Sequence, residues 1–367
     1  MQKWNRRWFL ASLAATCAAE THGKAHVFPS AAVRYPDPAT EFTVVRLTDP
    51  QFTSSLPLPG NRGILARSIL FASDLAGDWQ VFWMDLRTKD PRQLTDAKEL
   101  DPASIALAPK DKSFWHFDGP ALIETTLANL KPREIYRVPE GYEKLPGVSF
   151  SEDGQYAAFV EKAAESYRLQ LLHLARGTAS TLVESPEELR DPLLRPRHAS
   201  LIYCKAGAPH NAGQWWSIDC DGQQSRRLAL AEGATLQVEW AADGHELQYL
   251  NRPSNPHKLT ALRAWTPETD KDAEIAETSQ FLQFDGNADA SAFVGSSGSK
   301  ASPYLVLLIR AAKRELTLAE HRASDPALVH PRFAPNSQFV VFVSDRHGKP
   351  AIYWIAVDKL VAETGGS

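Results

Sequence analysis

The sequence is short of several features that define whole classes of protein. Its 367 residues include only three cysteines, too few for a small scaffold stapled by disulfides. The net charge is −4 and the isoelectric point lies near 6.3, a balance that argues against nucleic acid as a partner. No apolar run is long enough to cross a bilayer. Hydrophobic residues still make up 43% of the chain, which is ample for a packed core.

The first 25 residues read as an export signal. Asn5-Arg6-Arg7 places two arginines before an apolar run over residues 8–19. The run is too short for a membrane span, and a paired arginine before it is typical of a twin-arginine signal. We therefore expect residues 1–25 to be removed and the mature chain to be periplasmic or secreted. A lipoprotein anchored through Cys17 is the alternative, although Thr16 before it fits lipidation poorly.

One structural unit recurs along the rest of the chain. Its clearest copy is residues 330–357, HPRFAPNSQFVVFVSDRHGKPAIYWIAV. A short turn is followed by an apolar strand, a glycine-containing turn and a second strand, which indicates a hairpin. An anchor residue before the first turn is followed nine positions later by another apolar residue, as with Phe333 and Phe342. The anchors fall at positions 62, 107, 150, 194, 240, 284 and 333.

This spacing predicts the fold. Short strands repeated about every 45 residues are typical of a β-propeller with four strands per blade. Seven anchors therefore predict one all-β domain, a single seven-bladed β-propeller over residues 26–367. The last repeat ends at Val357 without an outer strand, whereas residues 44–48, VVRLT, form an unpartnered strand near the other terminus. We expect this N-terminal strand to complete the last blade and close the ring, which leaves few exposed strand edges.

Cys204 and Cys220 are expected to be structural thiols.

A ligand site is expected on the propeller axis. Propellers bind ligands where the loops that lead into the innermost strands converge, so residues just before each anchor should share one face. His330 stands out in this layer because the proline after it fixes its backbone. Five arginines near this funnel are predicted to bind the carboxylates of a substrate, with ordinary surface charge as the alternative. They are Arg62, Arg67, Arg195, Arg197 and Arg332.

The last repeat also carries a resemblance to a known family. Together with Arg46-Leu47-Thr48-Asp49-Pro50, and with Trp216 and Asp221-Gly222 in the fourth repeat, it resembles the oligogalacturonate lyases. These are seven-bladed propellers that also resemble TolB-type propellers. The resemblance implies β-elimination of short galacturonate chains with a divalent cation, typically manganese. The cation would stabilise the charge that develops as the α-proton leaves, a histidine would act as base and an arginine would assist.

Most positions that the resemblance assigns to these roles are substituted. Gln214 falls at the assisting arginine, and Gln237 falls at the catalytic histidine. The base is therefore in doubt, because an amide is not usefully basic near neutral pH.

Most of the positions that the resemblance assigns to metal ligands are also substituted. Gln283 falls near one metal-binding histidine, and Leu328 replaces another. The remaining two metal positions are Asp325 and His330, and only at His330 does this chain have the same residue as the family. Gln283, Asp325 and His330 remain chemically sensible for a divalent cation such as Mn²⁺ or Ca²⁺. The alternative is a neutral, hydrogen-bonded floor of the funnel.

Two functions stay open from the sequence. The first is an exported propeller that acts on or binds acidic (uronate) oligosaccharides at the central funnel, by β-elimination if it is catalytic. The second is a non-catalytic periplasmic propeller that binds or scaffolds a sugar or a protein partner, since a fold does not fix chemistry. In either case we expect a monomer that neither binds nucleic acid nor spans a membrane.

Overall fold

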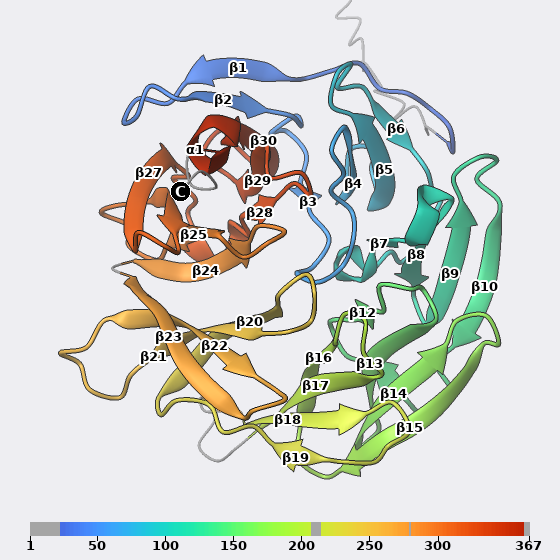
Figure 1. Ribbon diagram of the computed structural model, residues 1–367. Helices are drawn as coiled ribbons and strands as arrows, with labels where there is room; N and C mark the ends of the chain where they lie inside the picture. The colour runs from blue at the N-terminus through green and yellow to red at the C-terminus, as the bar shows by residue number, and fades with distance from the viewer. Residues whose placement is uncertain (1–22, 207–213, 279, 363–367) are drawn as a thin grey trace, which may run out of the picture.

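A computed structural model describes residues 23–206, 214–278 and 280–362. Its strands form seven sheets arranged radially around a central channel (Figure 1), which confirms the predicted seven-bladed propeller. One α-helix, α1 (Asp358–Ala362), is assigned within the described ranges, and no described helix is long and apolar enough to span a bilayer. Residues 1–22 of the predicted export signal, Cys17 included, lie outside the described residues, so the signal stays a prediction.

Blades one to three have innermost strands of only two residues. Listed from the channel outward, blade one contains β3 (Ser54–Ser55), β4 (Ser68–Ser73), β5 (Gln80–Asp85) and β6 (Pro91–Gln93). Blade two contains β7 (Ala106–Leu107), β8 (Ser113–Asp118), β9 (Ala121–Thr126) and β10 (Pro132–Arg137). Blade three contains β12 (Ser149–Phe150), β13 (Tyr156–Lys162), β14 (Tyr167–His173) and β15 (Thr178–Ser185), with β11 (Glu143–Lys144) also paired to β13.

Blades four to six have longer innermost strands, each with a bulge in its register. Blade four contains β16 (Leu189–Leu194), β17 (Ser200–Lys205), β18 (Gln214–Asp219) and β19 (Arg226–Arg227). Blade five contains β20 (Ala234–Trp240), β21 (Leu247–Arg252), β22 (Thr260–Thr266) and β23 (Lys271–Thr278). Blade six contains β24 (Phe281–Gly286), β25 (Ala292–Ser297), β26 (Tyr304–Ile309) and β27 (Arg314–Glu320).

Blade seven is built from both ends of the chain. Its inner strands are β28 (Arg332–Phe333), β29 (Phe339–Ser344) and β30 (Ala351–Ala356), and β2 (Thr43–Arg46) and β1 (Val33–Pro36) lie outside them. Figure 1 shows these two N-terminal strands along the edge of the C-terminal blade. Val44 pairs with Ile355, so the predicted closure by the N-terminal strand is confirmed, and β1 adds a fifth strand.

The core lies between the blades. Each of the seven hydrophobic clusters formed by the described residues combines side chains from two neighbouring blades. Both faces of a middle strand are therefore covered, and β25 and β29 are buried at every position. This explains why the sequence reads as continuous apolar runs such as Phe339–Ser344 and not as strict alternation.

Cys204 lies opposite Trp215, and Cys204 and Cys220 are both free thiols.

Blade one departs from the repeat. The predicted anchor at Arg62 does not lie in the innermost strand, because β3 ends at Ser55 and a loop over residues 56–67 separates it from β4. We call these residues the crossing loop. The side chain of Asn61 donates to the carbonyl of Val148 at 2.8 Å and accepts from the N–H of Phe150 at 3.3 Å, both in blade three. The loop therefore reaches across the channel from blade one.

Ring closure should make a measurable contribution to stability. Val44 in β2 is fully buried between blades six and seven, whereas Val33 in the neighbouring β1 is 46% exposed. We expect Val44→Ala to lower the free energy of unfolding by about 2 kcal/mol, because it leaves a cavity in a packed cluster. Val33→Ala is the matched control and should change it by less than about 0.5 kcal/mol. Urea denaturation of the two variants checks this, and equal midpoints would contradict it.

Candidate functional site

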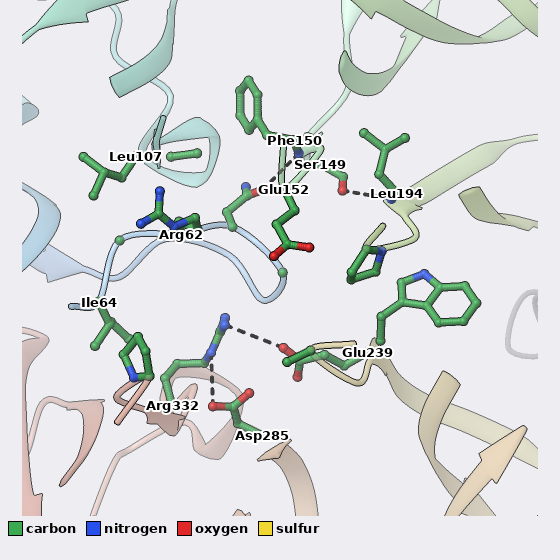
Figure 2. A pocket seen from close by; sticks show the side chains of 18 of the residues that line it. Arg62, Ile64, Leu107, Ser149, Phe150, Glu152, Leu194, Glu239, Asp285 and Arg332 are labelled. Carbon is green, nitrogen blue, oxygen red and sulfur yellow. Dashed lines mark hydrogen bonds and ion pairs between the residues drawn. The ribbon is translucent and has the colours of Figure 1, made fainter. Parts of the chain in front are cut away.

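The channel has two chemically different ends. The seven innermost strands run in the same direction around it, so their N-terminal ends form one opening, which we call the mouth. Their C-terminal ends form the turn end, where short turns lead to the second strands. The sequence places the candidate site at the mouth. The structure also has a cavity of about 570 Å³ at the turn end, lined by the last residues of the innermost strands and by the crossing loop (Figure 2).

At the mouth, Gln283 and His330 form one hydrogen-bonded unit. The Gln283 amide nitrogen donates to the carbonyl of Ala327 at 2.8 Å and lies 3.1 Å from Nδ1 of His330. Its oxygen accepts from the backbone N–H of His330 at 2.9 Å and from the Ser296 hydroxyl at 3.4 Å. Burial, with a smaller contribution from Arg332, lowers the pKa of His330, so its imidazole is neutral near neutral pH.

Gln237 makes a similar connection one blade earlier. Its amide nitrogen donates to the carbonyl of Phe284 at 2.8 Å, and its amide oxygen accepts from the N–H of the same residue at 2.9 Å. A register shift between Thr235 and Gln237 precedes it in β20, and such bulges re-aim side chains. The position that the resemblance assigns to the base is therefore occupied by a neutral clamp between blades five and six.

The other predicted mouth residues do not join this unit. Asp325 is exposed, and its Oδ1 accepts from the N–H of Ala327 to cap a short 3₁₀ helix, η3 (Pro326–Leu328). Leu328 ends that helix and is 38% exposed. Gln214 begins β18, the third strand of blade four, opposite Lys205.

These donors fit a metal ion poorly. The described part of the chain contains no group of three or more His, Cys, Asp or Glu side chains placed to hold one. Gln283 does not add a free ligand, because its oxygen already accepts two hydrogen bonds and an amide oxygen has two lone pairs. The contacts of Gln283 and His330 match the alternative expectation of a neutral, hydrogen-bonded floor.

The turn-end cavity contains a cluster of charged groups. Glu239 lies next to the last residue of β20, Asp285 near the end of β24, and Arg332 at the start of β28, so three consecutive blades contribute (Figure 2). An Arg332 terminal nitrogen is 3.6 Å from Oε1 of Glu239, and its Nε is 3.5 Å from Oδ2 of Asp285. The backbone N–H of Phe333 donates to Asp285 at 2.6 Å. Gly60 of the crossing loop lines the same cavity as Glu239.

One of the two carboxyl groups holds a proton. Burial raises the pKa of Glu239 to about 8, and the neighbouring charge of Asp285 adds to this, while Arg332 acts in the opposite direction. Burial also raises the pKa of Asp285, against the effects of Arg332 and of the Phe333 N–H. Two carboxylates beside one guanidinium cannot both ionise at low cost. Near neutral pH the cluster therefore consists of an Asp285–Arg332 ion pair and a neutral Glu239.

The structure brings together two of the five predicted arginines. Arg62 and Arg332 both line the turn-end cavity, although Arg62 is also paired with Asp111 at 2.8 Å. Arg195 bonds the carbonyl of Gly244 at 2.7 Å and pairs with Glu268. Arg197 is 63% exposed and lies 3.5 Å from Glu152. Arg67 is exposed and is the last residue of the crossing loop.

Sequence reasoning missed Glu239, Asp285 and the crossing loop. A signal for the two acids was present, since each is a charged residue directly beside an aromatic anchor, in Glu239-Trp240 and Phe284-Asp285. No sequence pattern gave the direction of the crossing loop, because its hydrogen bonds to other blades are with blades two and three.

Comparison with known proteins identifies the family to which the chain belongs. A family model described as oligogalacturonate lyase matches residues 22–306, and the chain belongs to this family. It is 27% identical to an oligogalacturonide lyase of Pectobacterium atrosepticum and 25% identical to an oligogalacturonate lyase of Dickeya dadantii, in each case over 87% of this chain and 94% of the relative.

A solved structure of an oligogalacturonate lyase in complex with manganese has the same fold. It matches with a TM-score of 0.86 at 23% identity and covers 91% of this chain and 98% of its own. This likeness concerns the fold, and the manganese is a property of that protein.

The clamp at Gln237 should be structural. Gln237→Ala leaves both backbone groups of Phe284, a residue that is 1% exposed, without their partner. We expect the free energy of unfolding to fall by about 2 kcal/mol, because unsatisfied buried groups carry their full desolvation cost. Gln223→Ala, at an exposed turn position, is the control. Denaturant titration that gives the same midpoint for both variants would refute the clamp.

The proton on Glu239 should make stability depend on pH. The folded chain keeps this proton up to about pH 8, whereas an unfolded glutamate releases it near its usual pKa of 4.5. The folded state therefore binds more protons within this window, and the free energy of unfolding should decrease as pH rises through it. Glu239→Gln should flatten this slope in denaturation curves taken across the window. Parallel pH profiles for the variant and the unmodified protein would contradict the assignment.

Proposed function

We propose that this chain is an exported, monomeric propeller that binds acidic (uronate) oligosaccharides at its central channel without cleaving them by metal-assisted β-elimination. The observation that carries the proposal is the use of Gln237 and Gln283 as hydrogen-bonding clamps between blades. Export rests on the paired Arg6-Arg7 near the N-terminus. Membership of the oligogalacturonate lyase family supplies the class of ligand.

β-Elimination makes demands that these side chains do not meet. A base must remove the α-proton of the uronate, and a cation or other donor must stabilise the charge that develops. Gln237 is not basic and both ends of its amide are already bonded. His330 keeps an imidazole, but its lowered pKa makes it a weak base. Asp325 is exposed and caps a helix, and the oxygen of Gln283 is already hydrogen-bonded. These two residues therefore do not complete a cation site with His330.

Binding, in contrast, is supported by the channel itself. A cavity of about 570 Å³ is within the range of small-molecule sites. It combines the guanidinium groups of Arg62 and Arg332, which suit carboxylates, with the partly exposed ring of Trp240, on which a sugar ring can lie. A channel that keeps its cationic and aromatic walls without a base is suited to recognition.

Two assays on the purified mature chain test the proposal. With trigalacturonate and added Mn²⁺, we expect no growth of the ultraviolet absorbance of unsaturated uronates above a protein-free control. Calorimetry with the same sugar should show binding, and neutral maltotriose, which lacks carboxylates, should bind at least about tenfold more weakly.

Either assay can overturn the proposal. A rise in absorbance that His330→Ala abolishes would show that the family reaction persists. Equal heats for trigalacturonate and maltotriose, or no heat from either, would remove the uronate as the ligand.

A further inference from the structure

Side chains that line the turn-end cavity contain four buried nitrogen and oxygen atoms that make no hydrogen bond within the described residues, although one of them, Nε of Arg332, lies 3.5 Å from the carboxylate of Asp285. They are Nε and Nη1 of Arg332, Nε2 of Gln248 and Oε2 of Glu239. Unpaired buried groups cost free energy and are rare in native proteins. Around this cavity they are groups that a ligand could engage.

The chemistry of these atoms identifies what the ligand must supply. Arg332 and Gln248 offer nitrogen donors only at these positions. Glu239, which is 7% exposed, adds a hydroxyl donor in its protonated form, and the carboxylate of Asp285 competes with a ligand for this proton. A set of donors facing one space is complementary to a group with two acceptor oxygens, and guanidinium binds carboxylate particularly well. Asp285 already neutralises Arg332, so the charge of a single ligand carboxylate is balanced by Lys110 in the same cavity lining, and a dianion is disfavoured.

The side chains that line the cavity indicate what the rest of the ligand contains. The rings of Trp115 and Phe150 stack on each other with centroids 4.9 Å apart, and both residues line the cavity together with Trp240. The volume of about 570 Å³ accommodates a molecule considerably larger than a free carboxylate ion. A ring that carries one carboxylate satisfies both the aromatic walls and the buried donors.

We infer that the turn-end cavity is a binding site for a ring-bearing monocarboxylate, whose carboxylate is received by Arg332, Gln248 and Glu239. Glu239 lies two residues beyond the mouth position Gln237 along β20, and Arg332 begins β28 two residues after His330. The inference rests on the proposed function only because a uronate residue is one such ligand. The cavity and its unpaired donors do not depend on it.

The site should respond to pH through Glu239. The charged groups that face it are Arg332 and Asp285 from the adjacent blades, and Arg62, Lys110 and Glu152 line the same cavity. A bound carboxylate beside Glu239 requires that its proton stays in place. Ionisation above the pKa of about 8 replaces a donor by a second negative charge. Affinity should therefore be full below this pH and decline above it.

Two variants and two simple probes test the inference. The probes are benzoate and monomeric galacturonate, measured by calorimetry at about pH 6.5 and about pH 9. Glu239→Gln keeps a donor at every pH, so it should retain its affinity at the higher pH where the unmodified protein loses about tenfold or more. Gln248→Leu deletes an unpaired buried donor, so the fold should be no less stable while affinity falls about tenfold. Gln223→Leu, on the surface, is the control.

The outcomes separate this inference from the proposed function. Absence of binding of both probes at the lower pH, affinity unchanged in Gln248→Leu, or equal pH dependence in Glu239→Gln would each overturn it. If trigalacturonate binds the unmodified protein and Gln248→Leu equally well, the proposed function stands and this site fails. If the probes bind with the expected variant pattern while trigalacturonate does not bind, the site stands and the proposed function fails.

Discussion

The inner wall of the ring depends on bonds from side chains of one blade to the backbone of the next. An innermost strand has a partner on one side only, and its other edge carries N–H and C=O groups that must be satisfied. The Ser149 hydroxyl accepts from the N–H of Leu194 at 3.0 Å, and Gln237 serves both backbone groups of Phe284. Asp285 accepts from Phe333. These contacts fix the spacing of the blades around the channel.

This arrangement sets structure and chemistry in competition for the same side chains. A residue that faces the channel can bond a neighbouring blade or act on a ligand, and an amide with both ends bonded is committed to the first task. Gln237 and Gln283 are committed in this way at the mouth. Arg332, Gln248 and Glu239 at the turn end still have atoms without partners. Within one family fold, the centre of recognition can thus lie deeper in the channel while the scaffold is preserved.

The sequence predicts the ring better than it predicts the site. The anchors repeat because every blade packs against two others. Six of the seven lie in innermost strands, and the closing strand at Val44 follows from the unfinished last repeat. The site depends on contacts without a period. Asn61 reaches blade three across the channel, and Glu239, Asp285 and Arg332 meet only when three blades are assembled. The anchor at Arg62 fails because the crossing loop shifts the first blade out of register.

The composite last blade has a consequence for how the molecule is assembled. The N–H of Ile352 bonds the hydroxyl of Thr48 over 304 positions of sequence, and residues at the N-terminal side also pair with blade one through Val27 and Arg92. During translation, Thr48 is synthesised long before Ile352. We therefore expect the pairing of β2 with β30 within the seventh sheet to form late, since such distant pairing is slow. Until then the apolar residues that pack against β2 stay uncovered, which makes this interval the one in which the nascent chain most needs protection from aggregation.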